Sequence, residues 1–225
     1  MRTDHPTHDV TALRAELSAR LPARPPGGAK KPDELEERCR LYLQALRWPS
    51  GVECPRCDEN DRLLWLDSRE KWHCYSCRYQ FSVTAGTLFH SSHLPLWKWF
   101  VSVQLMTESR QGISANQLRH VLGGSYKTFW FTTHRIRVAM RGRGQPLLRS
   151  VVGDFGVREL GLRDLGDRRR VAGPHHHLSE KYLAAYVEER RWLEANQDNP
   201  HVFRDTILAL VRGEGLSYDQ LVAAR

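Results

Sequence analysis

Apolar positions along the chain recur at helical spacing, except in one stretch where their spacing is that of short strands. The first predicted helix begins at Pro32-Asp33, where Asp33 and Glu36 have the spacing of a capping box, and it ends before Pro49. One face of this helix is apolar and is expected to pack on the strands that follow: Leu35, Cys39, Leu43 and Leu46.

Three short strands are predicted between residues 62 and 83. Arg62–Leu66 and Lys71–His73 are rich in apolar and aromatic residues, and the polar turn Asp67–Glu70 joins them. Tyr79–Val83 is the third predicted strand. Aromatic residues of these strands are expected to cover a small centre: Trp65, Trp72 and Phe81.

Three further helices are predicted between residues 84 and 143. The first contains Leu96–Met106 and is broken at Arg110-Gln111-Gly112. Ser114 caps the second helix, which ends at the turn Gly123-Gly124, and Ser125 caps the third. A short helix, a glycine turn and a longer polar helix have the arrangement of a helix-turn-helix.

The two ends of the chain and one internal segment show a different character. The N-terminus is expected to be flexible and basic, and Gly, Arg and Asp dominate a segment before the tail that has little apolar periodicity. Short helices are predicted to form the tail, beginning at Ser179 and Pro200. The predicted divisions are residues 1–31, the helix and ribbon at 32–83, the helix-turn-helix at 84–143, a linker or deletion scar at 144–174, and the helical tail at 175–225.

Two Cys-x-x-Cys pairs lie within the strand-forming stretch, at Cys54, Cys57, Cys74 and Cys77. This spacing is typical of one tetrahedral zinc site, in which each pair forms a tight turn that presents two thiolates. Because protein fills all four positions, the predicted Zn²⁺ is a single structural ion. The fold class that follows is mainly α with a small β zinc ribbon. The alternatives are four reduced cysteines in a core, or a thioredoxin-like redox pair, which would need a βαβ pattern that the chain does not show.

Other residues with metal-binding or thiol chemistry have simpler interpretations. Cys39 lies alone on a helical pattern and is expected to be a small core residue. His73 lies beside Cys74 but is expected at the surface, because four thiolates already complete the site. His175-His176-His177 is expected to be an exposed turn, since adjacent residues rarely point at one centre.

Composition and charge add expectations about location and partner. No stretch approaches the roughly eighteen apolar residues of a membrane span, and no hydrophobic signal region follows the N-terminus, so a cytoplasmic location is expected. The net charge of +8 and a pI near 9.5 favour an anionic partner, most often nucleic acid.

Positive charge concentrates in the third helix of the predicted helix-turn-helix. Between Ser125 and Arg143 there are five basic residues and no acid. Residues near the start of such a helix can read base edges in DNA, and the later arginines suit phosphates. The alternative is an ordinary three-helix core with a solvated basic face. The candidate DNA contacts are Ser125, Tyr126, Lys127, Thr128, Trp130, Thr133, His134, Arg135, Arg137 and Arg141.

Taken in order, these motifs resemble bacterial transposases of insertion-sequence family fifteen-ninety-five. The resemblance covers about residues 32–143 and returns in the tail, at His176-His177, Lys181-Tyr182-Leu183 and Tyr186. Asp58 departs from the family pattern, in which a glycine is usual after the knuckle. The motifs that carry the resemblance are Arg47-Trp48-Pro49, Cys54-Pro55-Arg56-Cys57, Phe81–Thr87, Leu94-Pro95-Leu96 with Trp99, Gly112–Ala115, Ser125–Thr128, and His134–Arg137 with Ala139-Met140.

The resemblance also implies a nuclease that this chain lacks in recognisable form. In this family a DDE nuclease follows the helix-turn-helix and holds two metal ions with three carboxylates, so Mg²⁺ is expected only if a nuclease activity exists. Asp154 resembles a remnant of the first acid, whereas Glu159, Asp164 and Asp167 lie too close together in sequence to build the rest. The simplest interpretation is an internal deletion of the nuclease.

The function implied by this resemblance is zinc-dependent DNA binding at the inverted ends of a transposon, without independent catalysis of transposition. The alternatives are a functional transposase, a regulator recruited by the host, an inhibitor of the parent element and a decayed reading frame. Double-stranded DNA is the expected partner, together with a second copy of the chain or the parent transposase. The expected location is the nucleoid.

Overall fold

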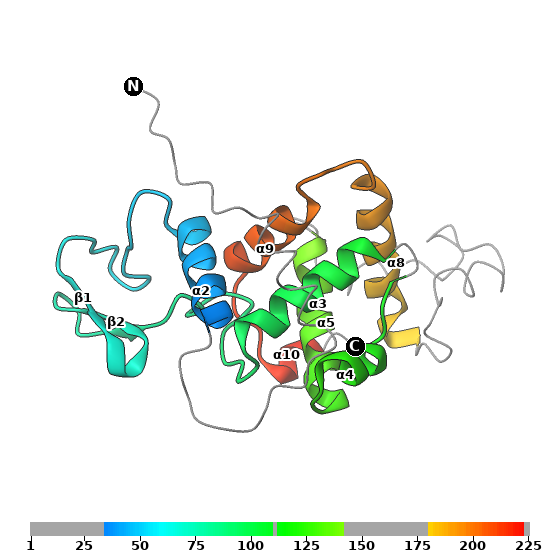
Figure 1. The fold of residues 1–225 in the computed structure, drawn as a ribbon, viewed down its shortest axis with the longest axis horizontal. Coiled ribbons are helices and arrows are strands. Elements are labelled where there is room, and N and C mark those ends of the chain that lie inside the picture. The colour runs from blue at the N-terminus through cyan, green and yellow to red at the C-terminus, as the bar shows by residue number, and fades with distance from the viewer. Residues whose placement is uncertain (1–33, 110–111, 142–179, 223–225) are drawn as a thin grey trace. The chain divides into compact units, whose positions relative to one another are not determined.

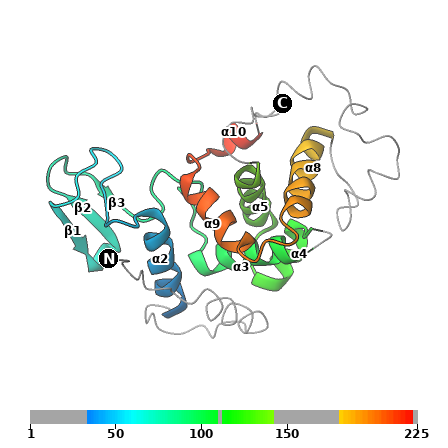
Figure 2. The same ribbon diagram turned by 90° about the horizontal axis from the view of Figure 1, so that it is seen from above.

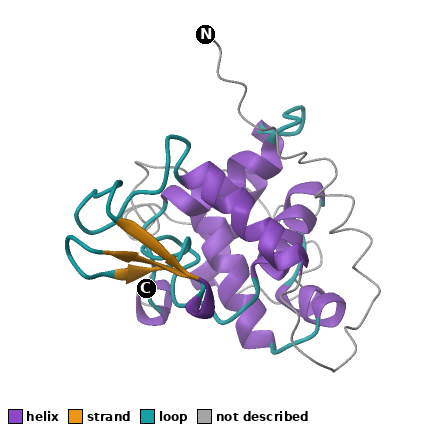
Figure 3. Ribbon diagram, turned by 60° about the vertical axis from the view of Figure 1, so that its left-hand side comes forward, coloured by secondary structure: helices purple, strands orange, loops and turns teal. Residues whose placement is uncertain are grey.

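The computed structural model describes residues 34–109, 112–141 and 180–222 of the chain. These residues form mainly helices with one small antiparallel sheet, which confirms the predicted fold class (Figures 1 and 3). The predictions for residues 1–31, for residues 144–174 with the acids within them, and for His175-His176-His177 concern residues outside the described ones. The elements are α2 (Glu34–Arg47), β1 (Leu63–Leu66), β2 (Lys71–Cys74), β3 (Gln80–Phe81), α3 (Leu96–Glu108), α4 (Ala115–Leu122), α5 (Tyr126–Met140), α8 (Glu180–Ala195), α9 (Val202–Arg212) and α10 (Tyr218–Val222).

The chain divides into two compact units, each of which draws on two separate stretches of sequence. Among the described residues, unit 1 contains residues 34–101 and Leu210–Gly215, and unit 2 contains those of Ser102–Ala209 together with residues 216–222. The tail predicted at 175–225 therefore contributes to both units, and the sequence pattern alone did not indicate this division.

In unit 1, α2 buries the apolar face that its sequence predicts. Leu35, Cys39, Tyr42 and Leu43 are buried, whereas Leu46 is only half-buried. The ring of Tyr42 makes an edge contact with that of Phe100, with centroids 5.8 Å apart. Cys39 is fully buried, as expected of a small core residue.

Glu36 has a long-range role that the sequence pattern did not predict. Its carboxylate accepts hydrogen bonds from the backbone N–H groups of Leu96 at 2.8 Å and Trp97 at 3.0 Å. Glu36 thus caps the first turn of α3, a helix that begins 60 residues later in the chain, because N–H groups at a helix start have no partner within their own helix. Its predicted capping partner, Asp33, lies outside the described residues.

The sheet of unit 1 is a three-stranded antiparallel ribbon in the order β1-β2-β3, beside α2 in Figure 2. Trp65 lies opposite Trp72 across the first pair of strands, and Trp72 lies opposite Phe81 across the second. A 3-10 turn at Asp67–Arg69 joins β1 to β2, where the sequence predicts a polar turn. The third strand is shorter than the predicted Tyr79–Val83.

The segment after α9 completes unit 1. The N–H of Leu88 donates to the carbonyl of Leu210 at 3.1 Å, and the N–H of Gly215 donates to that of Gly86 at 3.2 Å. Thr87 and Glu214 form an antiparallel bridge between these two hydrogen bonds. A side chain at Gly215 would come within 3.1 Å of the carbonyl oxygen of Thr87, so the close approach of the two segments favours glycine there.

In unit 2, α4 and α5 begin at the caps that the sequence predicts. The hydroxyl of Ser114 accepts from the N–H of Gln117 at 3.1 Å, and the Gln117 side chain accepts from the N–H of Ser114 at 2.8 Å. The hydroxyl of Ser125 accepts from the N–H of Thr128 at 3.1 Å. The turn between the helices holds Gly123 and Gly124 at φ of 66° and 127°, values that residues with a side chain rarely adopt.

The helix α5 is buried on most of its surface. Its packing partners in unit 2 include α4, α8 and α10. The buried set contains charged and polar residues beside apolar ones: Phe129, Thr132, Thr133, His134, Arg135, Ile136, Arg137, Ala139 and Met140. A helix that other helices cover on several sides need not have one apolar and one polar face. Its exposed residues therefore cannot be identified from the sequence pattern.

The tail helices bury much of their apolar surface. Val187 of α8 and Leu221 of α10 are buried in unit 2. In α9, Phe203, Ile207 and Leu210 are fully buried, whereas Leu208 is half-buried. Ser217 and Gln220 form reciprocal side-chain to N–H hydrogen bonds at the start of α10, at 3.2 Å and 2.7 Å.

Candidate metal centre and nucleic-acid interface

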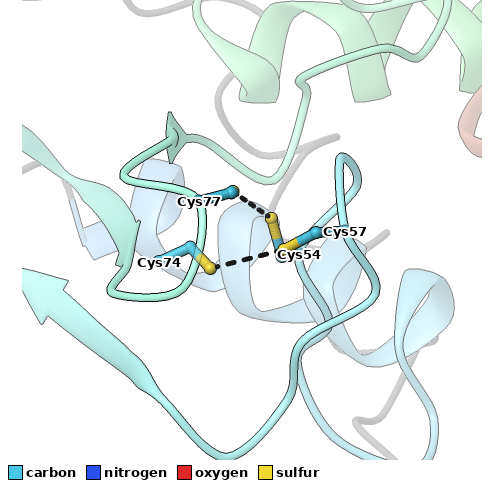
Figure 4. Close-up of side chains that lie close together, drawn as sticks. All are labelled: Cys54, Cys57, Cys74 and Cys77. Atoms are coloured by element: carbon cyan, nitrogen blue, oxygen red, sulfur yellow. Dashed lines mark hydrogen bonds between the residues drawn. The ribbon is translucent and has the colours of Figure 1, made fainter.

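Four cysteine side chains converge in the ribbon of unit 1 (Figure 4). Their sulfur atoms all lie within 4.8 Å of one another, and the Cys54–Cys77 and Cys57–Cys74 pairs are each 3.6 Å apart. Four Zn–S bonds of about 2.3 Å in a tetrahedron place the sulfurs about 3.8 Å apart. The cluster therefore has the dimensions of a four-thiolate zinc site.

Each cysteine pair lies on a tight backbone knuckle. In the first, the N–H of Asp58 donates to the carbonyl of Cys54 at 2.9 Å, and in the second, the N–H of Cys74 donates to the carbonyl of Tyr79 at the same distance. The residue after each knuckle, Asp58 or Arg78, has a φ of 58°. This is the left-handed region, which explains why glycine is usual there and why aspartate, whose short polar side chain tolerates it, can replace glycine.

Glu59 joins the two knuckles, and the sequence analysis did not identify it. One carboxylate oxygen accepts from the N–H groups of Asp61 at 3.1 Å and Arg62 at 3.3 Å, and the other accepts from the hydroxyl of Ser76. The Ser76 hydrogen bond, followed by those from the backbone, lowers the pKa of Glu59. The only indication in the sequence was an acidic residue two positions after a Cys-x-x-Cys pair. Such a residue could equally be an exposed charge without hydrogen bonds to either knuckle.

The ionisation of the thiols fits a site that requires a cation. Burial opposes ionisation of Cys77, but the N–H of Tyr79 and the neighbouring thiols bring its pKa down to about 7. The N–H of Glu59 favours the thiolate of Cys57, yet the neighbouring thiols outweigh it and raise the pKa of Cys57 to about 12. Ionisation of Cys77 thus opposes that of Cys57, and a bound divalent cation would stabilise both thiolates.

Aromatic residues surround this centre largely as predicted. Cys54, Cys74, Phe81 and Ala85 form a buried cluster. The partly buried residues packed against it are Trp48, Val52, Leu63, Trp72, Cys77 and Tyr79. Trp65 instead lies 5.3 Å from Trp72 and under the guanidinium of Arg40, so it links the sheet to α2. His73 is outside the sulfur cluster and contacts the ring of Tyr75.

The predicted DNA contacts separate into accessible and buried groups. Ser125, Tyr126 and Lys127 are exposed at the start of α5, and Thr128, Trp130 and Arg141 are half-buried. Thr133, His134, Arg135 and Arg137 are buried. In this arrangement the four buried residues are inaccessible to a duplex, and their role as DNA contacts stays a prediction.

Specific partners hold the two buried arginines of α5. The Nε of Arg137 donates to the carboxylate of Glu189 at 2.7 Å, and the two side chains are 1% and 4% exposed. Arg135 donates to the carbonyl of Leu216, and burial lowers the pKa of its guanidinium. Arg135 and Arg137, which the sequence analysis predicts to contact phosphates, are thus hydrogen-bonded to the tail.

Accessible polar residues also lie on α4, which the sequence analysis did not consider. Asn116, Gln117 and His120 are exposed, and Arg119 is half-buried. The buried residues of α4 are Ala115, Leu118 and Leu122, so the polar residues occupy the remaining face at helical spacing. The exposed start of α5 follows α4 after the turn at Gly123-Gly124, and the two helices pack on each other. We call this set the α4–α5 surface: Asn116, Gln117, Arg119, His120, Ser125, Tyr126 and Lys127.

None of the helices within the described residues is both long and apolar enough to cross a membrane.

Comparison with known proteins relates this chain to mobile genetic elements. Residues 34–80 match the transposase zinc-ribbon domain, which includes all four cysteines of the cluster. An uncharacterized protein in transposable element ISH50 of Halobacterium salinarum is 29% identical over 157 residues, which cover 69% of this chain and 52% of that protein. The chain thus spans about half the length of this relative. No solved structure matches the chain. With its four-cysteine ribbon, the chain is a relative of insertion-sequence transposases.

Proposed function

We propose that this protein binds double-stranded DNA through the α4–α5 surface, with the zinc ribbon as a structural module. The observation that carries the proposal is the distribution of charge. Residues 112–141, which form α4 and α5, contain five Lys and Arg residues and no acid, whereas residues 34–83 contain eight basic and nine acidic residues. A region of one sign on a protein related to transposases favours a phosphate-rich partner.

The geometry of α4 and α5 supports major-groove binding. A short helix, a glycine turn and a longer helix follow one another as in a helix-turn-helix, in which the start of the recognition helix presents side chains to bases, and the start of α5 is exposed. Tyr126 is 52% exposed, and Lys127 beside it supplies a cation. A base contact would come from Tyr126, and Lys127 and Arg119 would contact the phosphate backbone.

The DNA target proposed here is the pair of inverted repeats that end the parent element. The relation to insertion-sequence transposases supports this target, since such ends are what those enzymes recognise. The protein partners would be a second copy of the chain or the parent transposase, and the location the nucleoid. Strand cleavage by this chain would need three converging carboxylates. The acids considered for it, Asp154, Glu159, Asp164 and Asp167, lie outside the described residues.

Binding is tested by fluorescence anisotropy with zinc-loaded protein and a labelled duplex at several salt concentrations. If Arg119, Lys127 and Arg141 are the phosphate contacts, log affinity falls with log salt at a slope of about −3, and five contacts give a slope between about −4 and −5. Lys127→Ala should weaken binding and reduce the slope by about 1. Lys71→Ala, which removes the same charge from β2, is the matched control. A slope near zero, or equal effects of the two variants, would contradict the proposal.

The target is tested by selection from random duplexes, with the recovered motif located in the host genome. A motif at both flanks of the gene supports recognition of transposon ends. A motif at unrelated promoters would instead indicate a recruited regulator, and an absence of enrichment would contradict sequence-specific recognition.

A further inference from the structure

Aromatic residues of the tail cover one part of α5 in unit 2. We call this part, which carries Trp130, Phe131 and His134, the outward face of α5. The ring of Tyr182 in α8 makes edge contacts with the rings of Trp130 and His134, at centroid distances of 5.4 Å and 5.1 Å. Tyr218 of α10 stacks on Phe131 at 5.7 Å with 13° between the ring planes. The tail thus covers the part of α5 that follows its exposed start.

The tail also engages the basic residues of α5. Glu189 pairs with Arg137, and the carbonyl of Leu216 accepts from Arg135. The pKa of Arg141 is lowered by burial, and the nearby carboxylate of Glu188 acts in the opposite direction. The ammonium of Lys127 lies 5.0 Å from the centre of the Tyr218 ring. The tail groups in contact with these basic residues are thus a carboxylate, a carbonyl and an aromatic ring, each of which attracts a cation as a phosphate does.

The Arg137–Glu189 contact satisfies its two partners only in part. Both Nη atoms of Arg137 and one carboxylate oxygen of Glu189 are buried without a hydrogen-bond partner among the described residues. Unsatisfied buried polar groups are costly, and an arginine fork binds a phosphate through two parallel hydrogen bonds. A DNA phosphate could therefore satisfy Arg137 more fully than Glu189 does.

From this shared chemistry we infer that α8 and α10 compete with DNA for the outward face of α5. The tail acts as an intramolecular inhibitor, and full DNA binding displaces it. The inference rests on the proposed function, because it concerns access to the same DNA-binding helix. Displacement would release Arg135 and Arg137 to phosphates, and by linkage a change that weakens tail docking raises DNA affinity by up to the same factor.

Two variants of the full chain weaken docking in different ways. Glu189→Gln removes the charge that neutralises Arg137, and Tyr218→Ala removes the ring over Lys127 and Phe131. Tyr218 is 45% exposed, so its truncation leaves the core intact. Glu194→Gln is the matched control, because Glu194 lies on α8, is 63% exposed and pairs only with Arg190 among the ion pairs of the described residues. Glu194→Gln changes the net charge as Glu189→Gln does, without touching α5.

Anisotropy with a mixed-sequence duplex of about 30 base pairs, on zinc-loaded protein, separates the outcomes. We expect Glu189→Gln and Tyr218→Ala to bind at least about fivefold more tightly than Glu194→Gln, with a salt slope between about −4 and −5. Hydrogen exchange should show that saturating DNA lowers the protection of α8 and α10.

Other results would separate the proposed competition from the proposed DNA binding. If the wild type binds DNA and the two variants bind no more tightly than the control, the competition is refuted and the proposed function stands. If neither the wild type nor any variant binds at low salt, both are refuted. If Glu189→Gln proves unfolded by circular dichroism, Tyr218→Ala alone decides.

Discussion

At the scale of single residues, Glu59 determines how firmly the two cysteine knuckles are held together. Its carboxylate accepts hydrogen bonds from Asp61 and Arg62 beside the first knuckle and from Ser76 within the second. Groups that orient metal ligands typically change metal affinity by about 10- to 100-fold. Glu59→Ala should therefore weaken zinc binding by at least about tenfold, measured by competition with a chromophoric chelator. Asp61→Ala removes the same charge from the same loop and should leave zinc affinity nearly unchanged. Equal losses in the two variants would show that only local charge matters.

At the scale of elements, the start of α3 depends on a side chain of α2. Glu36→Ala removes the acceptor for the N–H groups of Leu96 and Trp97, and the loss of a helix cap costs about 0.5–2 kcal/mol. We expect a lower free energy of unfolding in urea with zinc bound. Glu36→Gln should recover part of this loss, because its amide oxygen still accepts. Glu34→Ala, an exposed acid in the same first turn of α2, is the control. A loss with Glu34→Ala equal to that with Glu36→Ala would mean that helix-dipole charge, and not the cap, is responsible.

At the scale of the whole molecule, the sequence predicts local features well and long-range partners poorly. The cysteine spacing predicts the ribbon, and Ser114 and Ser125 predict the starts of α4 and α5, because ligand spacing and caps act within a few residues. The burial of Arg137 could not be predicted in this way, since its partner Glu189 is 52 residues away. Basic residues on α5 resemble a solvated face until a second helix is known to cover them. The one available sign was the presence of aromatic residues beside those arginines.

Whether the ribbon folds independently of unit 2 depends on the metal. The ribbon buries few residues, so the free energy of zinc binding, about 10–16 kcal/mol in zinc-finger peptides, should supply its stability. Chelation should therefore abolish hydrogen-exchange protection in β1, β2 and β3 while α4 and α5 stay protected, because the core of unit 2 contains no ligand of the metal cluster. Cys57→Ala should reproduce the effect of chelation, whereas Cys39→Ala, a buried cysteine outside the cluster, should retain zinc. Simultaneous loss of protection in α4 and α5 would show instead that the two units unfold as one cooperative structure.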